Sequence, residues 1–419
     1  MKISLDARQV GREFASTRVL LAAFFAILYL PFVYNYGYKF VGIEYVDLPS
    51  FWCAAKAVFR LSSSPYGRDA LQALMPSQHV YPYLYPPPSL LLVYPLSLVP
   101  YQWATIATLV LNHVTVLFLL WFLPAKLFKI SMREGAALIF LDLAYVLTFQ
   151  PIVFTLSCGQ VSLASACFIF LFWHLARTNR FFWAAACLAF ALLLKTVPFI
   201  LLFPLLVCKK YRIVVYAVIL LAGISVVSLL LLPYELWRQW FTDVLPSMSY
   251  TGSFPPGAIT NVSLNGFVSH LFLKSELNPY PLINSPILAL TVGLVSSGAV
   301  FISSLYAVRK RFVRSPAGSL DWAVLIFLPL IALMSPVAWV HHLVYLLAGL
   351  LILLNLAVAR ETYSIKTTIF TLACAITLSV EGGIRGKFLA LLGVWVISVF
   401  LAKTSRCDSP VEARRNHLE

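Results

Sequence analysis

The amino-acid sequence predicts an all-α polytopic membrane protein. The chain has 419 residues, of which 61% are hydrophobic and only 11% are charged, and its mean hydropathy is +0.86. Apolar segments recur along the chain, separated by stretches that hold most of the Lys and Arg residues. A water-soluble protein has too little interior to bury so many apolar side chains, whereas a bilayer solvates them. We therefore expect a single integral membrane domain over residues 1–419.

Twelve apolar segments are long enough to cross a bilayer, or nearly so. Several are shorter than the roughly 20 residues that a straight span needs, so the segments allow about 10 to 13 transmembrane helices. The two segments that flank Lys195 are either short spans or halves of one broken helix, which would have to line a cavity. The expected segments are 17–37, 101–123, 134–156, 160–176, 181–194, 197–208, 213–232, 286–308, 321–335, 338–358, 367–382 and 388–402.

Basic residues predict the orientation, because cytoplasmic loops of membrane proteins are enriched in Lys and Arg. With the N-terminus in the cytoplasm, 22 of the 31 basic residues fall inside. We therefore expect a multi-pass protein of the cytoplasmic (inner) membrane with both termini in the cytoplasm. Topology then explains the net charge of +15, and no nucleic-acid partner is needed. The inside residues are Lys2, Arg8, Arg12, Arg18, Lys126, Lys129, Arg133, Arg177, Arg180, Lys209, Lys210, Arg212, Arg309, Lys310, Arg311, Arg314, Arg360, Lys366, Lys403, Arg406, Arg414 and Arg415.

Two long connections, at about 38–100 and 233–285, lie outside in this orientation. In the first, apolar residues follow Pro49 at helical spacing, as in a helix that lies in the membrane interface. This connection continues as "YPYLYPPPS", in which prolines stiffen the backbone and tyrosines suit the headgroup region. The second contains "PYELWRQWFTDVLPSM", another candidate interfacial helix.

Glu44 and Asp47 stand out because the chain has only 16 acidic residues. Asp47 follows the first apolar segment and precedes Pro49, as is typical of the start of a helix. It is either an N-cap, whose side chain accepts a backbone N–H bond, or a general base at the mouth of an external cavity. The residue types alone leave both roles open.

Ionisable residues inside apolar segments usually line a site or a pathway. Lys195 lies between two such segments, where it either faces a site or extends to the headgroups. His341 and His342 follow a helix break at Ser335-Pro336. Because neighbouring helical residues point about 100° apart, we expect at most one of the two histidines to face a site.

An ordered set of motifs resembles glycosyltransferase family 87 over roughly residues 40–350. Shortly after Asp47 come "FWCAAKAVF", "SPYG", "YLYPPPSLLLVYPLSLVP", "GQVSLA", "LLLKTVPFILLFPLL", "TNVSLNG" and "SPVAWVHH". The resemblance implies a GT-C type membrane enzyme. Such enzymes take a sugar, most commonly mannose and in other cases arabinofuranose, from a polyprenyl phosphate and place it on an envelope glycan or glycolipid. Where members often read Asn-Gln-Ser-Leu, this chain has Asn261-Val262-Ser263-Leu264.

The resemblance also implies that an acidic residue in the first outside segment is the catalytic base, and the matching position is Asp47. One base suffices for an inverting transfer. A departing lipid phosphate needs cations and N–H donors rather than an acid. No outside Asp-x-Asp pair and no CxxC pair is present, so we expect no metal and no other cofactor. The expected donor-binding residues are Lys195, His341, His342, Asn261 and Gln160, with Glu44, Arg385 and Lys387 as further candidates.

Two other functions fit a polytopic chain with intramembrane charges. A glycan polymerase or ligase would use a diphosphate-linked lipid in the same compartment. A lipid or sugar transporter would place its charges near the bilayer midplane and would show repeated halves. The polar candidates instead gather toward the expected outer face, next to the two long outside segments, which favours the glycosyltransferase.

The predicted orientation can be tested by labelling single cysteines in a variant without the native ones. An impermeant thiol reagent added outside should label cysteines placed at Ser63 and Ser275, because both lie in outside segments. A cysteine at Ser315 should stay unlabelled until the membrane is opened. The opposite pattern would invert the expected topology.

Overall fold

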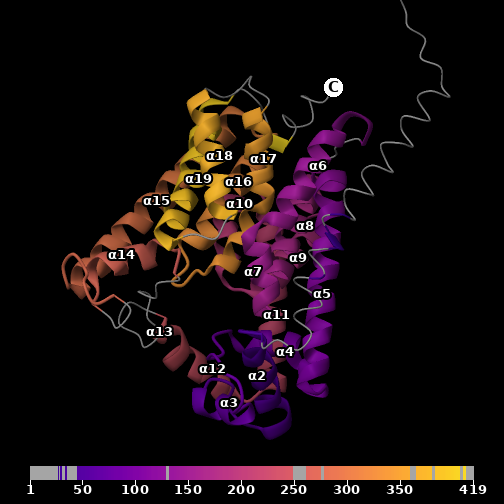
Figure 1. Cartoon of the computed structure of the whole chain (residues 1–419), viewed down its shortest axis with the longest axis vertical. Coiled ribbons are helices and arrows are strands. Elements are labelled where there is room, and N and C mark those ends of the chain that lie inside the picture. Colours follow the sequence, from indigo (N-terminus) through magenta and orange to yellow (C-terminus); the bar gives the residue numbers. More distant parts are fainter. Residues whose placement is uncertain are drawn as a thin grey trace, which may run out of the picture.

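The described part of the chain forms helices and contains no β-strand. In the computed structural model these helices make a bundle with a smaller helical cap at one end (Figure 1). Glu44 and most of the expected first span lie outside the described residues. Those are 45–128, 132–248, 261–274, 278–358, 365–379, 383–405 and 409–411, with Ile27, Tyr29, Leu30 and Tyr34.

Within the described residues, the bundle contains the segments expected to cross the membrane after residue 100, which confirms an all-α membrane protein. Four helices are long and apolar enough to span a bilayer, and seven more apolar helices in the described chain are shorter. The number of about twelve spans therefore stays a prediction. The bundle helices are α5 (Tyr101–Phe122), α6 (Met132–Thr148), α7 (Gln150–Cys158), α8 (Ser162–Arg177), α9 (Phe181–Leu194), α10 (Leu202–Val207), α11 (Tyr211–Leu231), α14 (Leu264–Phe272), α15 (Pro286–Arg314), α16 (Ser319–Leu333), α17 (Leu347–Val358), α18 (Ile365–Ser379) and α19 (Ile384–Thr404).

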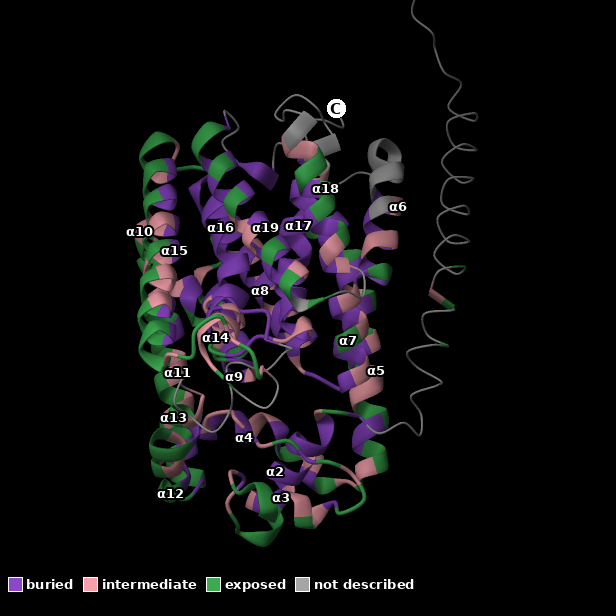
Figure 2. Ribbon diagram, turned by 60° about the vertical axis from the view of Figure 1, so that its left-hand side comes forward, coloured by how far each residue is buried: buried purple, intermediate pink, exposed green. Residues whose placement is uncertain are grey.

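Burial separates inner from outer helices. Every residue of α16 is buried, as expected for a helix that is apolar on all sides and lies in the core. By contrast, α11 and α15 keep large apolar side chains exposed, among them Leu230 and Ile302 (Figure 2). Exposed apolar faces of this extent suit contact with lipid rather than water.

Prolines interrupt three helices of the bundle. The expected span 134–156 is broken at Phe149 into α6 and α7, with Pro151 in the first turn of α7. The segments around Lys195 form a broken helix, in which α9 ends and a 3-10 helix, η4 (Val197–Leu201), starts with Pro198 in its first turn. The third break follows α16, where Pro336 precedes η6 (Val340–Leu346). Proline lacks a backbone N–H and is tolerated in the first turn of a helix, so Pro151 and Pro198 lie where a new helix starts.

The cap, which comprises residues 45–100 and 233–248, has a hydrophobic core of its own. Buried side chains from both stretches, including Phe51, Leu90 and Leu236, pack together. Two hydrogen bonds also join the stretches, from Ser64 Oγ to Gln239 Oε1 at 2.6 Å and from Trp240 Nε1 to the carbonyl of Leu84 at 3.3 Å. The cap helices are α2 (Leu48–Leu61), α3 (Arg68–Leu74), α4 (Pro87–Val93), η2 (Tyr94–Leu98), α12 (Tyr234–Gln239), η5 (Trp240–Val244) and α13 (Leu245–Ser247).

The amphipathic helix expected after Pro49 is present as α2, but its environment differs from the expectation. Its apolar residues Phe51, Ala54 and Ala55 are buried in the cap core and are not laid on a membrane interface. The reason is that α3, α4 and η2 fold over this face, so the helix buries its apolar side against the same chain segment. Helix α4 also packs against α9 and α11, which seats the cap on the bundle.

Candidate functional site

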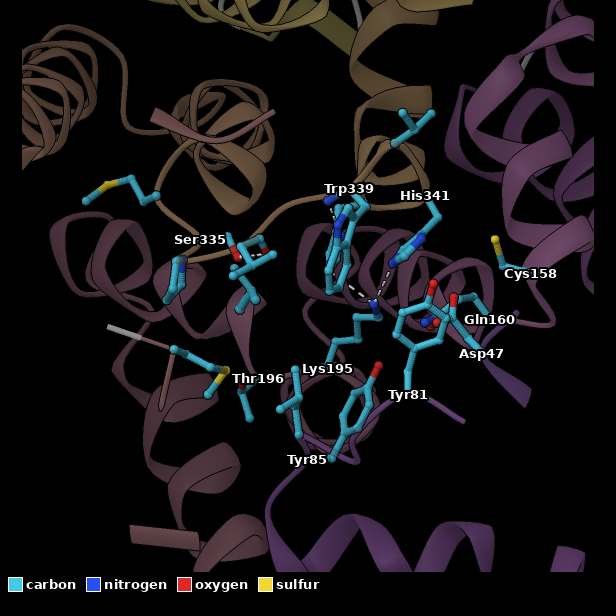
Figure 3. A pocket seen from close by; sticks show the side chains of 18 of the residues that line it. Asp47, Tyr81, Tyr85, Cys158, Gln160, Lys195, Thr196, Ser335, Trp339 and His341 are labelled. Atoms are coloured by element: carbon cyan, nitrogen blue, oxygen red, sulfur yellow. Dashed lines mark hydrogen bonds between the residues drawn. The ribbon is translucent and has the colours of Figure 1, made fainter. Parts of the chain in front are cut away.

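A cavity of about 940 Å³ lies between the cap and the proline-interrupted ends of the bundle helices. It joins chain segments that are far apart in sequence, and Figure 3 shows their side chains pointing toward one another. Its volume is in the range of small-molecule sites. The polar residues in its wall include Asp47, Tyr81 and Tyr85 from the cap and Cys158, Gln160, Lys195, His341, His342 and Lys387 from the bundle.

Asp47 is held at the cavity by a close contact between cap and bundle. Its backbone N–H donates to the carbonyl of Cys158 at 2.9 Å, just where α7 ends. The next residue, Gly159, has φ of 66°, in the left-handed region that glycine adopts at little cost. A Cβ on Gly159 would lie 2.9 Å from Tyr45 and 3.0 Å from Leu48. Glycine in the "GQVS" motif therefore allows the start of α2 to reach the end of α7.

The side chain of Asp47 does not cap α2. Asp47 is the N-cap residue, yet its carboxylate accepts no capping hydrogen bond, so the N-cap interpretation does not account for the carboxylate. The Gln160 and Cys158 side chains are its hydrogen-bonding neighbours. Burial raises the pKa of Asp47, and the Gln160 hydrogen bond offsets part of that rise, as does Lys195 when it is in its ammonium form. The result is a half-buried carboxylate of increased basicity at the cavity wall.

Lys195 lies between two histidines in the cavity wall, close to Asp47. Its Nζ is 3.2 Å from Nε2 of His341 and 3.0 Å from Nε2 of His342, and it lies over the ring of Tyr85, 5.9 Å from the centroid. All three hydrogen-bonded side chains are buried. The expectation that Lys195 faces a site rather than the headgroups fits this placement.

Hydrogen-bond directions assign the protons of this cluster. The backbone N–H of Trp339 donates to Nδ1 of His342 at 3.0 Å, which places the proton of the uncharged ring on Nε2. That N–H points at Lys195 Nζ, so the lysine nitrogen accepts it, which an ammonium group does not do. The arrangement therefore fits a neutral lysine amine. The amine donates to His341 Nε2, whose proton then lies on Nδ1, a buried atom without a partner among the described residues.

The expectation that at most one histidine faces the site is wrong. Both histidines contact Lys195 and line the cavity. The expectation assumed an α-helix, but the pair lies at the start of the 3-10 helix η6. There the two rings stand 4.5 Å apart and tilted by 33°, and Phe154 stacks on His341, so both rings face the same cavity.

The remaining predicted residues divide between the cavity and its surroundings. Gln160 is buried beside Asp47 and lines the cavity. Lys387 also lines it and donates to Gln150 at 2.6 Å. Arg385 is exposed and is not among the described residues that line the cavity. Asn261 is buried but is likewise not part of the wall.

Asn261 instead holds the loop that precedes the histidines. Its Oδ1 accepts from the N–H of Ala338 at 2.9 Å and from that of Ser263 at 3.1 Å, and its amide donates to the carbonyl of Pro336 at 3.1 Å. Val262 pairs its N–H with Ala338 as well, at 2.7 Å. The "TNVSLNG" and "SPVAWVHH" motifs therefore act together, and Asn261 is a positioning residue for the histidine pair rather than a cavity residue.

Several aromatic residues line the cavity although the sequence pattern did not indicate them as site residues. Tyr81 and Tyr85 belong to the "YPYLYPPPS" stretch, which was interpreted as suited to headgroups. Trp240 and Trp339 also line the cavity. The extended, proline-rich backbone was a usable signal, because a stiff segment carries its tyrosines at fixed positions at little entropic cost.

Three side chains of the cavity could together hold a cation. Asp47, Cys158 and His341 each offer one ligand atom, and these atoms lie within 4.8 Å of one another. An O, S and N donor set of this kind suits zinc. Sequence spacing indicates no such cluster, because its members come from three separate segments. Lys195 bonds to the same histidine, and its ammonium form would oppose a bound cation.

Comparison with known proteins identifies one family. The model of glycosyltransferase family 87 matches residues 83–336, which is more than half of the chain. No curated protein and no solved structure matches the chain. The GT-C type fold implied by the resemblance therefore stays a prediction.

The contact at Gly159 can be tested by adding one methyl group. Gly159→Ala should lower the unfolding temperature, because an alanine in the left-handed backbone conformation of this position costs roughly 1–3 kcal/mol of folding free energy. Its Cβ would also overlap Tyr45. Gly223→Ala is the matched control, since no atom lies within 4 Å of its added Cβ. It lies inside α11, where alanine is favoured by about 1 kcal/mol. Equal unfolding temperatures for the two variants would contradict the described contact.

Proposed function

Because the chain belongs to glycosyltransferase family 87, we propose that it transfers a sugar from a polyprenyl-phosphate donor to a hydroxyl group of an envelope glycan or glycolipid. Membership of the family makes it a membrane glycosyltransferase rather than a transporter. We further propose that mannose is the sugar, that the cavity opens at the outer (periplasmic) face, and that Asp47 is the base.

The observation that carries the proposal is that a half-buried carboxylate and a lysine held by two histidines line the same cavity. Asp47 has hydrogen-bonding neighbours but no capping bond, so its carboxylate is available for chemistry. Beside it stands the Lys195 amine, which two histidines hold in place. A base and an anion-binding nitrogen that line the same cavity are the groups that displacement of a phosphate by a hydroxyl requires.

The lysine cluster supports an anionic donor. The amine of Lys195 is shared by two histidines. An arriving phosphate would favour the ammonium form, because a buried anion and cation stabilise each other in a low-dielectric site. Binding of the donor then assembles the charge that later stabilises the departing lipid phosphate.

The apolar wall of the cavity supports a lipid donor. Phe199, Phe203 and Phe301 line it from η4, α10 and α15. Phe203 packs edge-on against Phe301 at 5.0 Å, and Phe199 is 54% exposed on the outer surface. These rings lead from Lys195 toward the apolar exterior of the bundle, which is the path that a polyprenyl chain needs if its phosphate lies at the lysine.

In the transfer step the acceptor oxygen bonds to the anomeric carbon of the donor sugar while the bond from that carbon to the phosphate oxygen breaks. The Asp47 carboxylate takes the hydroxyl proton, and the lipid phosphate leaves with the electron pair. Attack opposite the leaving phosphate inverts the anomeric configuration. The phosphate is already a stable anion, so it needs no proton from a general acid.

The first functional prediction concerns the charge of Asp47. Membranes supplied with individual labelled polyprenyl-phosphate sugars should transfer mannose, and Asp47→Asn should reduce this rate by about 100-fold or more, because positioned proton transfer contributes that much. Donor affinity should persist. The unfolding temperature at neutral pH should stay equal or rise, since a carboxylate whose pKa is raised on folding destabilises the fold when ionised.

Two controls accompany this variant. Asp69→Asn removes an exposed cap carboxylate and should leave transfer unchanged. Glu44→Gln tests the secondary candidate, and a collapse there with normal turnover in the Asp47 variant would move the base to Glu44. If no polyprenyl-phosphate sugar serves as donor, the proposed function is wrong.

The second functional prediction concerns pH. Asp47 accepts a proton only when ionised, and burial raises its pKa. The value of kcat/KM should therefore rise with pH to a plateau, with a midpoint above the value of about 4 that is usual for an exposed aspartate. A pH profile of the wild-type enzyme measures this midpoint. A midpoint at or below about 4 would show that the carboxylate which controls the rate is not in a buried environment.

A further inference from the structure

The cap contains a second cavity, of about 710 Å³, between its two chain stretches. The first stretch contributes Ser64, Arg68 and His79, and the second contributes Gln239 and Asp243. The Ser64–Gln239 hydrogen bond of 2.6 Å ties the two sides together. We call this cavity the cap groove. The two stretches also pack together in the hydrophobic core of the cap, which holds the walls of the groove in place relative to each other.

The cap groove shares a wall with the cavity that contains Asp47 and Lys195, which we call the catalytic cavity. Tyr81, Pro82 and Leu84 line both, and the bond from Trp240 to the Leu84 carbonyl fastens this wall to the second stretch. Tyr81 is labelled in Figure 3 beside Asp47 and Lys195. A ligand in the groove would therefore contact residues 81–84, and these residues also line the cavity that contains the proposed base, Asp47.

The two cavities differ in chemistry. The catalytic cavity is walled largely by phenylalanine and aliphatic side chains. The groove instead offers hydroxyl, amide, carboxylate and guanidinium groups next to the rings of Tyr66 and Tyr81. Hydrogen-bonding groups of both kinds, donors and acceptors, beside aromatic rings suit a polyhydroxylated ligand with apolar C–H faces. One basic and one acidic side chain, Arg68 and Asp243, favour a ligand without strong net charge.

We propose that the cap groove binds the acceptor glycan, so that the saccharide next to the accepting sugar lies in the groove and the accepting hydroxyl reaches Asp47 past Tyr81. This inference rests on the proposed function. It gives each substrate its own entrance. The lipid donor enters along the phenylalanines of the bundle, and the glycan enters through the polar cap. The groove thereby makes a glycan of at least two sugars the preferred acceptor.

Single substitutions in the groove separate acceptor binding from chemistry. Asp243→Ala and His79→Ala remove exposed side chains outside the catalytic cavity. With the polyprenyl-phosphate sugar that the enzyme uses held at saturation, the total glycolipid extract of the source membranes is titrated as acceptor. The amount of extract for half-maximal transfer should rise about tenfold in each variant, which corresponds to about 1.4 kcal/mol of lost hydrogen bonding. The maximal rate and the affinity for the donor should stay unchanged.

The matched control is Glu235→Ala, which removes another exposed carboxylate from the same cap stretch outside the groove. It should behave as wild type. Unchanged half-saturation in both groove variants, or a fall in maximal rate without a change in half-saturation, would overturn the assignment of the groove to the acceptor. Absence of turnover with every lipid-phosphate sugar in the wild-type enzyme would instead overturn the proposed function itself.

Discussion

A helix that stops inside a membrane protein leaves backbone N–H and C=O groups that only the protein can pair, and this constraint organises the site. The chain stops being helical after Cys158, after Leu194 and after Leu333, and all three ends border one cavity. At the first end, the free carbonyl of Cys158 takes the N–H of Asp47. Beyond the third, Asn261 pairs the backbone of the loop that carries the histidines. The bonds that complete the fold are thus the bonds that position the proposed catalytic groups.

Burial then sets the electrostatics of the cavity. It raises the basicity of Asp47, while Gln160 and the ammonium form of Lys195 limit that rise, so the carboxylate can ionise and still attract a proton. The lysine is held by two histidine rings in a form that fits a neutral amine. An anionic ligand changes this balance, because charge is costly in such a site until its counter-charge is present. Under the proposed function, the site would therefore become charged only when a phosphate binds, and would not hold an unpaired ammonium without it.

The division between bundle and cap gives the proposed enzyme two kinds of surface. The bundle supplies apolar walls, which a polyprenyl chain can follow from the lipid. The cap has its own core and surrounds a polar groove. Because α4 packs on α9 and α11, the two parts meet at a fixed border, where Tyr81 belongs to both cavities. A reaction between a membrane-bound donor and a water-exposed acceptor needs such a border, since neither environment alone solvates both substrates.

The sequence by itself determined the class of protein, most helices and Asp47, Lys195 and the histidine pair as candidates, because hydropathy, prolines and rare charges in apolar segments are local properties. Gln160 became a candidate only through the resemblance of its motif to the family. Only the tertiary structure decided how these residues are used. A periodicity argument assigned one histidine to the site, but a 3-10 helix places both there. Asn261 hydrogen-bonds the loop before the histidines instead of lining the cavity, and α2 buries its apolar face within the cap. Tyr81, Tyr85 and Cys158 line the cavity, which the sequence did not indicate. Each of these outcomes depends on contacts between distant segments, and the pattern of residues along one segment carries no record of what packs against it.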